Sequence, residues 1–89
     1  MKIALRKFLR AKAHALKPVV ITGRAGISEA VLNEIDLALN HHELIKVRVN
    51  ALDREVRREM AEQICQTLQA ELVQMMGHVV TLYRLSPDK

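Results

Sequence analysis

The chain has 89 residues, which is the size of one compact domain and leaves no room for a second. Hydrophobic residues make up 49% of it but aromatic residues only 2%, so we expect an aliphatic core and no base-stacking platform. The net charge is +4. The single Cys65 excludes a disulfide framework, and no apolar stretch approaches the ~20 residues that cross a bilayer. We therefore expect a cytoplasmic protein rather than a secreted or membrane-spanning one.

An amphipathic helix is predicted over residues 3–16. Arg6, Arg10 and Lys17 fall on the side opposite Phe8, and the apolar side of the helix has helical spacing: Leu5, Phe8, Leu9, Ala13 and Leu16. Pro18 ends this helix because proline disfavours helical dihedral angles in the residue before it. The β-branched residues 19–22 that follow predict a short buried strand.

A second helix is predicted after the loop of residues 23–26, with Ser28 as its N-cap and its end near residues 40–42. Its expected buried side consists of Val31, Leu32, Ile35, Ala38 and Leu39. Residues 43–49 then alternate between an inner face of Ile45, Val47 and Val49 and an outer face of Leu44, Lys46 and Arg48. This pattern predicts a strand with a basic outer face.

A third helix is predicted to begin at Asp53 as its N-cap. Its expected core side comprises Val56, Met60, Ala61, Ile64, Cys65 and Leu68, and its arginines (Arg54, Arg57 and Arg58) and glutamates are expected to face water. Residues 72–76 and 79–83 flank Gly77-His78 and predict a hairpin with a type II′ turn, after which residues 85–89 are expected to fray.

These elements predict a single α+β domain over residues 1–89 with the order α-β-α-β-α-β-β. Strand connections that pass through a helix form right-handed crossovers, so we expect a small mixed four-stranded sheet in a two-layer arrangement, with helices on at least one face.

The positive charge is concentrated in the first 24 residues, which contain seven Lys and Arg and no acidic side chain. A one-sided positive field attracts a polyanion such as nucleic acid, although a solvated helix face is the ordinary alternative. Gly23-Arg24-Ala25-Gly26 lies between a strand and a helix, where two glycines allow backbone amides to approach a phosphate. A plain strand-to-helix turn would also explain this spacing.

Catalytic and metal sites have little support in the sequence. His41 and His42 lack further ligands at metal-binding spacing, and Cys65 lies among apolar residues rather than at a helix N-terminus beside a base. We therefore expect no metal, no cofactor, no small-molecule substrate and no catalysis.

Three segments resemble the CRM (chloroplast RNA splicing and ribosome maturation) domain, in particular its free-standing bacterial YhbY-like members. They are LKPVV at 16–20, GRAGI at 23–27 and HHELIKVRV at 41–49, and the resemblance extends over nearly the whole chain. The resemblance implies a fold similar to the C-terminal domain of translation initiation factor three. It also implies RNA binding, with the bacterial members associated with precursors of the large ribosomal subunit.

We therefore expect an RNA-binding protein, acting as a monomer, that assists assembly of the large ribosomal subunit. Its expected contacts are the loop backbone and an extended basic surface, formed by Gly23, Arg24, Ala25, Gly26, Arg6, Arg10, Lys17, Lys46 and Arg48. A protein-interaction module whose basic face docks an acidic partner is the main alternative, and an enzyme ranks below both.

Overall fold

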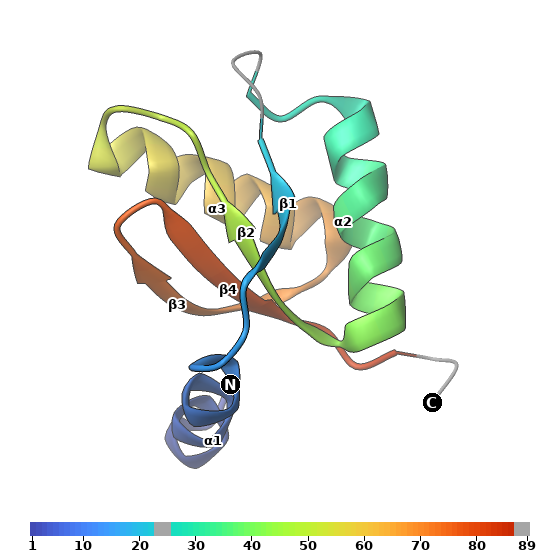
Figure 1. Cartoon of the computed structure of the whole chain (residues 1–89), viewed down its shortest axis with the longest axis vertical. Coiled ribbons are helices and arrows are strands. Elements are labelled where there is room, and N and C mark those ends of the chain that lie inside the picture. The colour runs from blue at the N-terminus through green and yellow to red at the C-terminus, as the bar shows by residue number, and fades with distance from the viewer. Residues whose placement is uncertain (23–25, 87–89) are drawn as a thin grey trace.

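The computed structural model describes residues 1–22 and 26–86 (Figure 1). Within these residues the helices are α1 (Ile3–Ala13), α2 (Glu29–His42) and α3 (Arg54–Leu68), and the strands are β1 (Pro18–Ile21), β2 (Leu44–Arg48), β3 (Glu71–Met76) and β4 (Val79–Tyr83). The predicted α+β class and the α-β-α-β-α-β-β order are confirmed.

The strands form one mixed four-stranded sheet in the order β1-β2-β4-β3. β1 pairs in parallel with β2, whereas β4 pairs antiparallel with both β2 and β3. The register sets Ile45 opposite Leu82 and Val47 opposite Val80, so that all four side chains point to the same face. The last strand is therefore inserted between β2 and β3, and β1 and β3 are the sheet edges.

The main core lies between this face of the sheet and two helices. Ile35 and Leu39 of α2 and Ala61 and Ile64 of α3 pack against the sheet, and in Figure 1 α3 lies behind β1 and β2. The buried residues of this core are Val20, Ile35, Leu39, Ile45, Val47, Val49, Ala61, Ile64, Val80 and Leu82. It is entirely aliphatic, as the composition predicts.

α1 covers part of the second face. Thr81 lies between the core residues Val80 and Leu82, so it points to the opposite face, yet its exposed fraction is only 2%. α1 contacts β2 and β3 on either side of β4, and its buried residues, Leu9 and Ala13, lie outside the main core. The helix therefore crosses β4 on that face and leaves the β1 side open.

The sequence interpretation placed too many apolar side chains in the interior. Val19 and Ile21 are 51% and 61% exposed, so β1 is not a buried strand: it is an edge strand with one face uncovered. Val56 is 42% exposed and Phe8 57% exposed, because the faces on which these helices are buried are narrower than their apolar stripes. The arginine at position 57, expected in water, is partly buried.

Helix ends follow local chemistry. The Ser28 side chain accepts a hydrogen bond from the Val31 amide at 3.1 Å, and Asp53 accepts one from the Glu55 amide at 2.9 Å, confirming both predicted N-caps. α1 ends at Ala13 rather than 16, because Pro18 is already paired with β2 as a strand residue.

The end of the chain is held in place up to residue 86. Glu43 ends α2 with a positive φ of 65°. Its carboxylate accepts a hydrogen bond from the Ser86 amide at 2.7 Å, and Ser86 is buried. The expected fraying of residues 85–89 therefore does not hold at Ser86, and residues 87–89 lie outside the described residues.

Candidate nucleic-acid interface

The predicted phosphate-binding loop is described at its last residue only, because Gly23, Arg24 and Ala25 lie outside the described residues. Gly26 has φ +79°, a conformation that L side chains rarely adopt. A Cβ atom at this position would lie 3.8 Å from Cε of Met60, which is ordinary contact. Glycine is therefore required here by backbone conformation rather than by crowding.

A pair of side chains fixes the point where this loop leaves the sheet. Thr22 is fully buried, and its amide donates to the Arg48 carbonyl at 2.9 Å. The Asn50 amide donates to Oγ1 of Thr22 at 2.9 Å, and Nδ2 of Asn50 donates to the Thr22 carbonyl at 3.0 Å. The last residue before the loop is thus hydrogen-bonded through both its backbone and its side chain to the end of β2.

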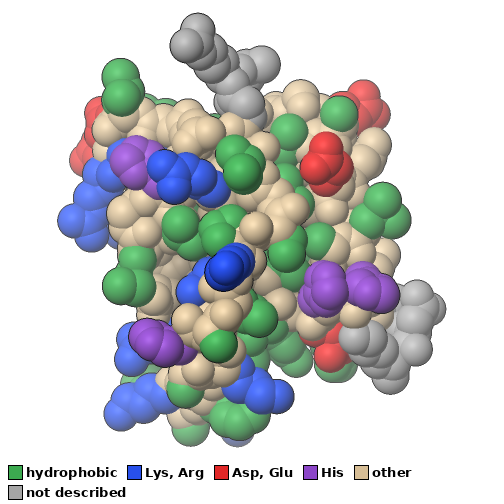
Figure 2. Space-filling model, viewed as in Figure 1, with side chains coloured by type: hydrophobic (Ala, Val, Ile, Leu, Met, Phe, Trp, Pro, Cys, Tyr) green, Lys and Arg blue, Asp and Glu red, His purple; other side chains and the backbone are tan. Residues whose placement is uncertain are grey.

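Cations adjoin this point along the second face of the sheet. Lys46 and Arg48 alternate with core residues of β2, and Nε of Arg48 donates to Oδ1 of Asn50 at 3.3 Å. Pro18 is the register partner of Lys46, whereas Lys17 is exposed in the segment between α1 and β1. Lys46 and Arg48 therefore lie together on one face of β2, and we call this pair the β2 cation row. Figure 2 shows Lys and Arg side chains across the centre and left of the molecule, with hydrophobic side chains among them.

The basic side of α1 faces the other edge of the sheet. Arg6 lines a groove along β3 together with Arg54 and Arg58 of α3. β3 and β1 are opposite edges of the sheet, so Arg6 lies away from the β2 cation row. Arg10 is exposed on α1. Sequence reasoning assigned Arg54 and Arg58 to a solvated face and gave no sign that they adjoin Arg6, because the contact depends on how α1 and α3 flank β3.

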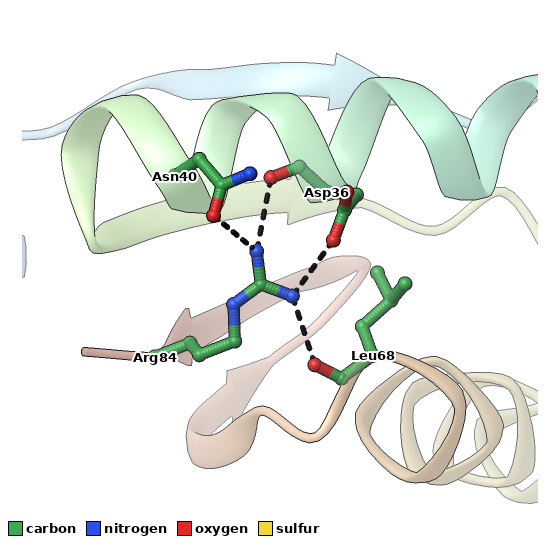
Figure 3. A network of polar contacts seen from close by, with 4 residues as sticks. All are labelled: Asp36, Asn40, Leu68 and Arg84. Atoms are coloured by element: carbon green, nitrogen blue, oxygen red, sulfur yellow. Dashed lines mark hydrogen bonds and ion pairs between the residues drawn. The ribbon is translucent and has the colours of Figure 1, made fainter. Parts of the chain in front are cut away.

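Two further arginines have structural partners. Arg84 follows β4, and its guanidinium donates to Oδ1 and the carbonyl of Asp36, to Oδ1 of Asn40 and to the carbonyl of Leu68 at 2.8–3.1 Å (Figure 3). It therefore links α2 and the end of α3 to the sheet. Nη1 of Arg57 donates to the carbonyls of Ala51 and Leu52 at 2.8 and 3.0 Å, which fixes the loop before α3.

The described residues contain no group of three His, Cys, Asp or Glu side chains placed to hold a metal ion, and none of their helices is long and apolar enough to span a bilayer. Burial, with help from Glu71 and Glu62, raises the pKa of the Cys65 thiol from 9.0 to about 11. This thiol is protonated at neutral pH and unsuited to act as a nucleophile.

The sequence profile of the CRS1/YhbY (CRM) domain matches residues 1–84. The chain belongs to the CRM-domain family. It is 47% identical over 83 residues to an RNA-binding protein of Haemophilus influenzae, covering 93% of this chain and 84% of that protein. It is 35% identical over 83 residues to a Bacillus subtilis protein named as a probable RNA-binding protein, YqeI, covering 93% and 86% of the two chains.

The fold has a close counterpart among solved structures. A solution structure of a hypothetical Staphylococcus aureus protein, described as a candidate RNA-binding protein, superposes with a TM-score of 0.87 at 34% identity. The match covers 97% of this chain and 90% of that one. This similarity confirms the CRM fold predicted from the sequence motifs.

Proposed function

We propose that this protein binds RNA, that its target is ribosomal RNA in precursor particles of the large subunit, and that it assists their assembly without catalysis. The observation that carries the proposal is the position of the β2 cation row. The row leads along β2 to Asn50, which hydrogen-bonds Thr22 at the start of a loop that ends in the positive-φ residue Gly26. The relatives named as RNA-binding proteins support the RNA-binding part of this proposal.

Each part of this surface has a distinct role in the proposal. The loop backbone, at Gly23 through Gly26, offers amides to a phosphate, and Arg24 adds charge there. Lys46, Arg48 and Lys17 neutralise phosphates and thereby release condensed counterions. Contacts of this kind carry little sequence information, so selectivity arises from the shape of a folded RNA.

An acidic protein partner is the second candidate function, and one observation favours it. Val19 and Ile21 expose apolar side chains on the same face as the β2 cation row. A protein interface commonly buries such side chains at its centre, whereas phosphate contacts do not need them. The two functions therefore predict different consequences of changing charge and of changing apolar surface.

Charge reversal tests the proposal directly. Lys46→Glu combined with Arg48→Glu should abolish binding of a structured ribosomal RNA fragment in a fluorescence anisotropy titration, because attraction at two contacts becomes repulsion. Arg54→Glu combined with Arg58→Glu makes the same change in net charge on α3 and should leave most of the affinity. Equal losses in both double variants would mean that net charge, rather than this surface, governs binding. Wild-type affinity in the first variant would overturn the proposal.

A further inference from the structure

A groove of about 430 Å³ separates α1 from the end of the sheet where β2 begins and β4 ends. Phe8 and Tyr83 both line it, and these are the only Phe and Tyr of a chain that has no Trp. Tyr83 is paired with Leu44 across β4 and β2, so both side chains point to the second face. Phe8 and Tyr83 are 75 positions apart in the sequence, and the fold brings their rings to the same groove.

The α1 side of the groove is mainly apolar and open to solvent. Phe8 is 57% exposed and Leu5 is 41% exposed, although both lie on the apolar side of α1, and Leu16, which follows the end of α1, is 38% exposed. An aromatic ring and neighbouring leucines that stay exposed together leave a large apolar area in contact with water, which a binding partner could bury. Contiguous exposed apolar patches of this kind mark interaction sites.

The positive charge beside the groove favours an RNA ligand over an apolar peptide. Nζ of Lys12 lies 5.3 Å from the Phe8 ring centroid, and α1 contains no acidic residue. The carboxylate of Glu43, which also lines the groove, accepts the Ser86 amide. Leu44 occupies the same face of β2 as Lys46, two residues along, so the groove adjoins the β2 cation row.

We propose that this groove binds an unpaired nucleobase of the RNA whose backbone lies along β2. The inference rests on the proposed function and adds the class of RNA: a strand with a bulged or looped-out nucleotide rather than a continuous duplex. The base stacks on Phe8, Tyr83 lines the same groove, and Lys12 contacts the adjoining phosphate. An exposed cation–π contact is weaker than base stacking on an aromatic ring, so a base can displace the ammonium from Phe8. Stacking at one groove is compatible with an aromatic content of 2%, which argued only against a broad platform.

Three RNA hairpins of equal length separate base recognition from phosphate contacts: one with a single bulged nucleotide, one in which that nucleotide is abasic, and one fully paired. Wild-type protein should bind the bulged hairpin about 5- to 150-fold more tightly than the abasic one, the range expected for stacking of one base. Phe8→Leu, which keeps the site apolar, should remove this difference without changing affinity for the abasic hairpin. Leu37→Ala alters another exposed apolar side chain, on α2, and should bind all three hairpins as the wild type does.

Tyr83 supplies an independent signal, because a chain with one Tyr and no Trp has a single dominant fluorophore. The bulged hairpin should quench its emission more than the abasic hairpin does. Equal affinity of wild-type protein for all three hairpins would overturn the inference and leave RNA binding intact. No binding to any hairpin would overturn both this inference and the proposed function. A dimer in sedimentation velocity that Phe8→Leu dissociates, with hairpin affinities unchanged, would assign the groove to a second copy of the chain instead.

Discussion

Replacing Gly26 by alanine should damage the proposed phosphate-binding loop while leaving the domain folded. Gly26 has φ +79°, and a non-glycine residue in the left-handed region costs roughly 1–2 kcal/mol. The reduced entropy of the unfolded chain offsets about 0.4–1 kcal/mol of this cost. The added Cβ makes only ordinary contact with Met60, at 3.8 Å from Cε, so no steric term is expected. The net loss of about 1 kcal/mol corresponds to a Tm lowered by roughly 4–8 °C for a domain of this size.

The matched control is Gly77→Ala in the β3–β4 turn. Gly77 also has a positive φ, 57°, and a Cβ there would meet nothing within 4 Å. Both variants should therefore lose similar stability, by thermal unfolding followed with circular dichroism. Only Gly26→Ala should weaken RNA binding, since shifting the backbone removes an amide contact to phosphate worth about 1.5–3 kcal/mol, or roughly a 10- to 150-fold loss of affinity. Anisotropy titrations at a temperature where both are folded measure this. Wild-type affinity in Gly26→Ala, at equal destabilisation, would show that the loop serves only as a turn.

Three further outcomes are expected. The affinity for structured RNA should fall steeply between low and moderate salt concentration. Arg48→Ala should reduce the slope of the logarithm of the association constant against the logarithm of the salt concentration by about 1. A slope near zero in the wild type would exclude phosphate contacts. Arg84→Lys should destabilise the fold by about 1–3 kcal/mol in urea unfolding, because a single ammonium nitrogen with three N–H donors cannot reproduce the four hydrogen bonds that the two Nη atoms of the planar guanidinium donate. The RNA affinity of the folded protein should stay unchanged, and unaltered stability would contradict the role assigned to this network. The pKa of Cys65 is raised from 9.0 to about 11, so iodoacetamide should alkylate this thiol at pH 8 about a hundredfold more slowly in the folded chain than in the urea-unfolded chain. The free energy of unfolding should also fall as the pH rises from about 9 toward 11, because the folded state binds this proton more tightly than the unfolded state does. Equal alkylation rates would refute the burial of the thiol.

The helices, strands and caps could be predicted because they depend on local sequence. Ser28 and Asp53 each accept a hydrogen bond from an amide two or three residues along, so their roles are visible within a few residues of sequence. Gly77 takes the positive φ that the first central residue of a type II′ turn needs. The order of elements follows from such signals together with hydrophobic periodicity.

Features that depend on sheet order could not be predicted in this way. Asn50 contacts Thr22 across 28 residues, and Arg84 contacts Asp36 across 48, with nothing in the intervening sequence to pair them. The exposure of Ile21 follows from the place of β1 at the sheet edge, and the β-branched character of that residue does not reveal it. The division of the cations between the β2 cation row and the β3 groove has the same origin, because it depends on where α1 crosses the sheet.

The proposed association of this protein with precursor large ribosomal subunits is tested most directly by gradient sedimentation of a cell extract containing the tagged protein. The account predicts that the protein sediments with precursor large subunits and is depleted from translating ribosomes. Charge reversal at Lys46 together with Arg48 should release it to the top of the gradient, because two attractive contacts become repulsive. Finding the wild-type protein only in the unbound fractions at low salt, or equally on small subunits and polysomes, would contradict the assignment.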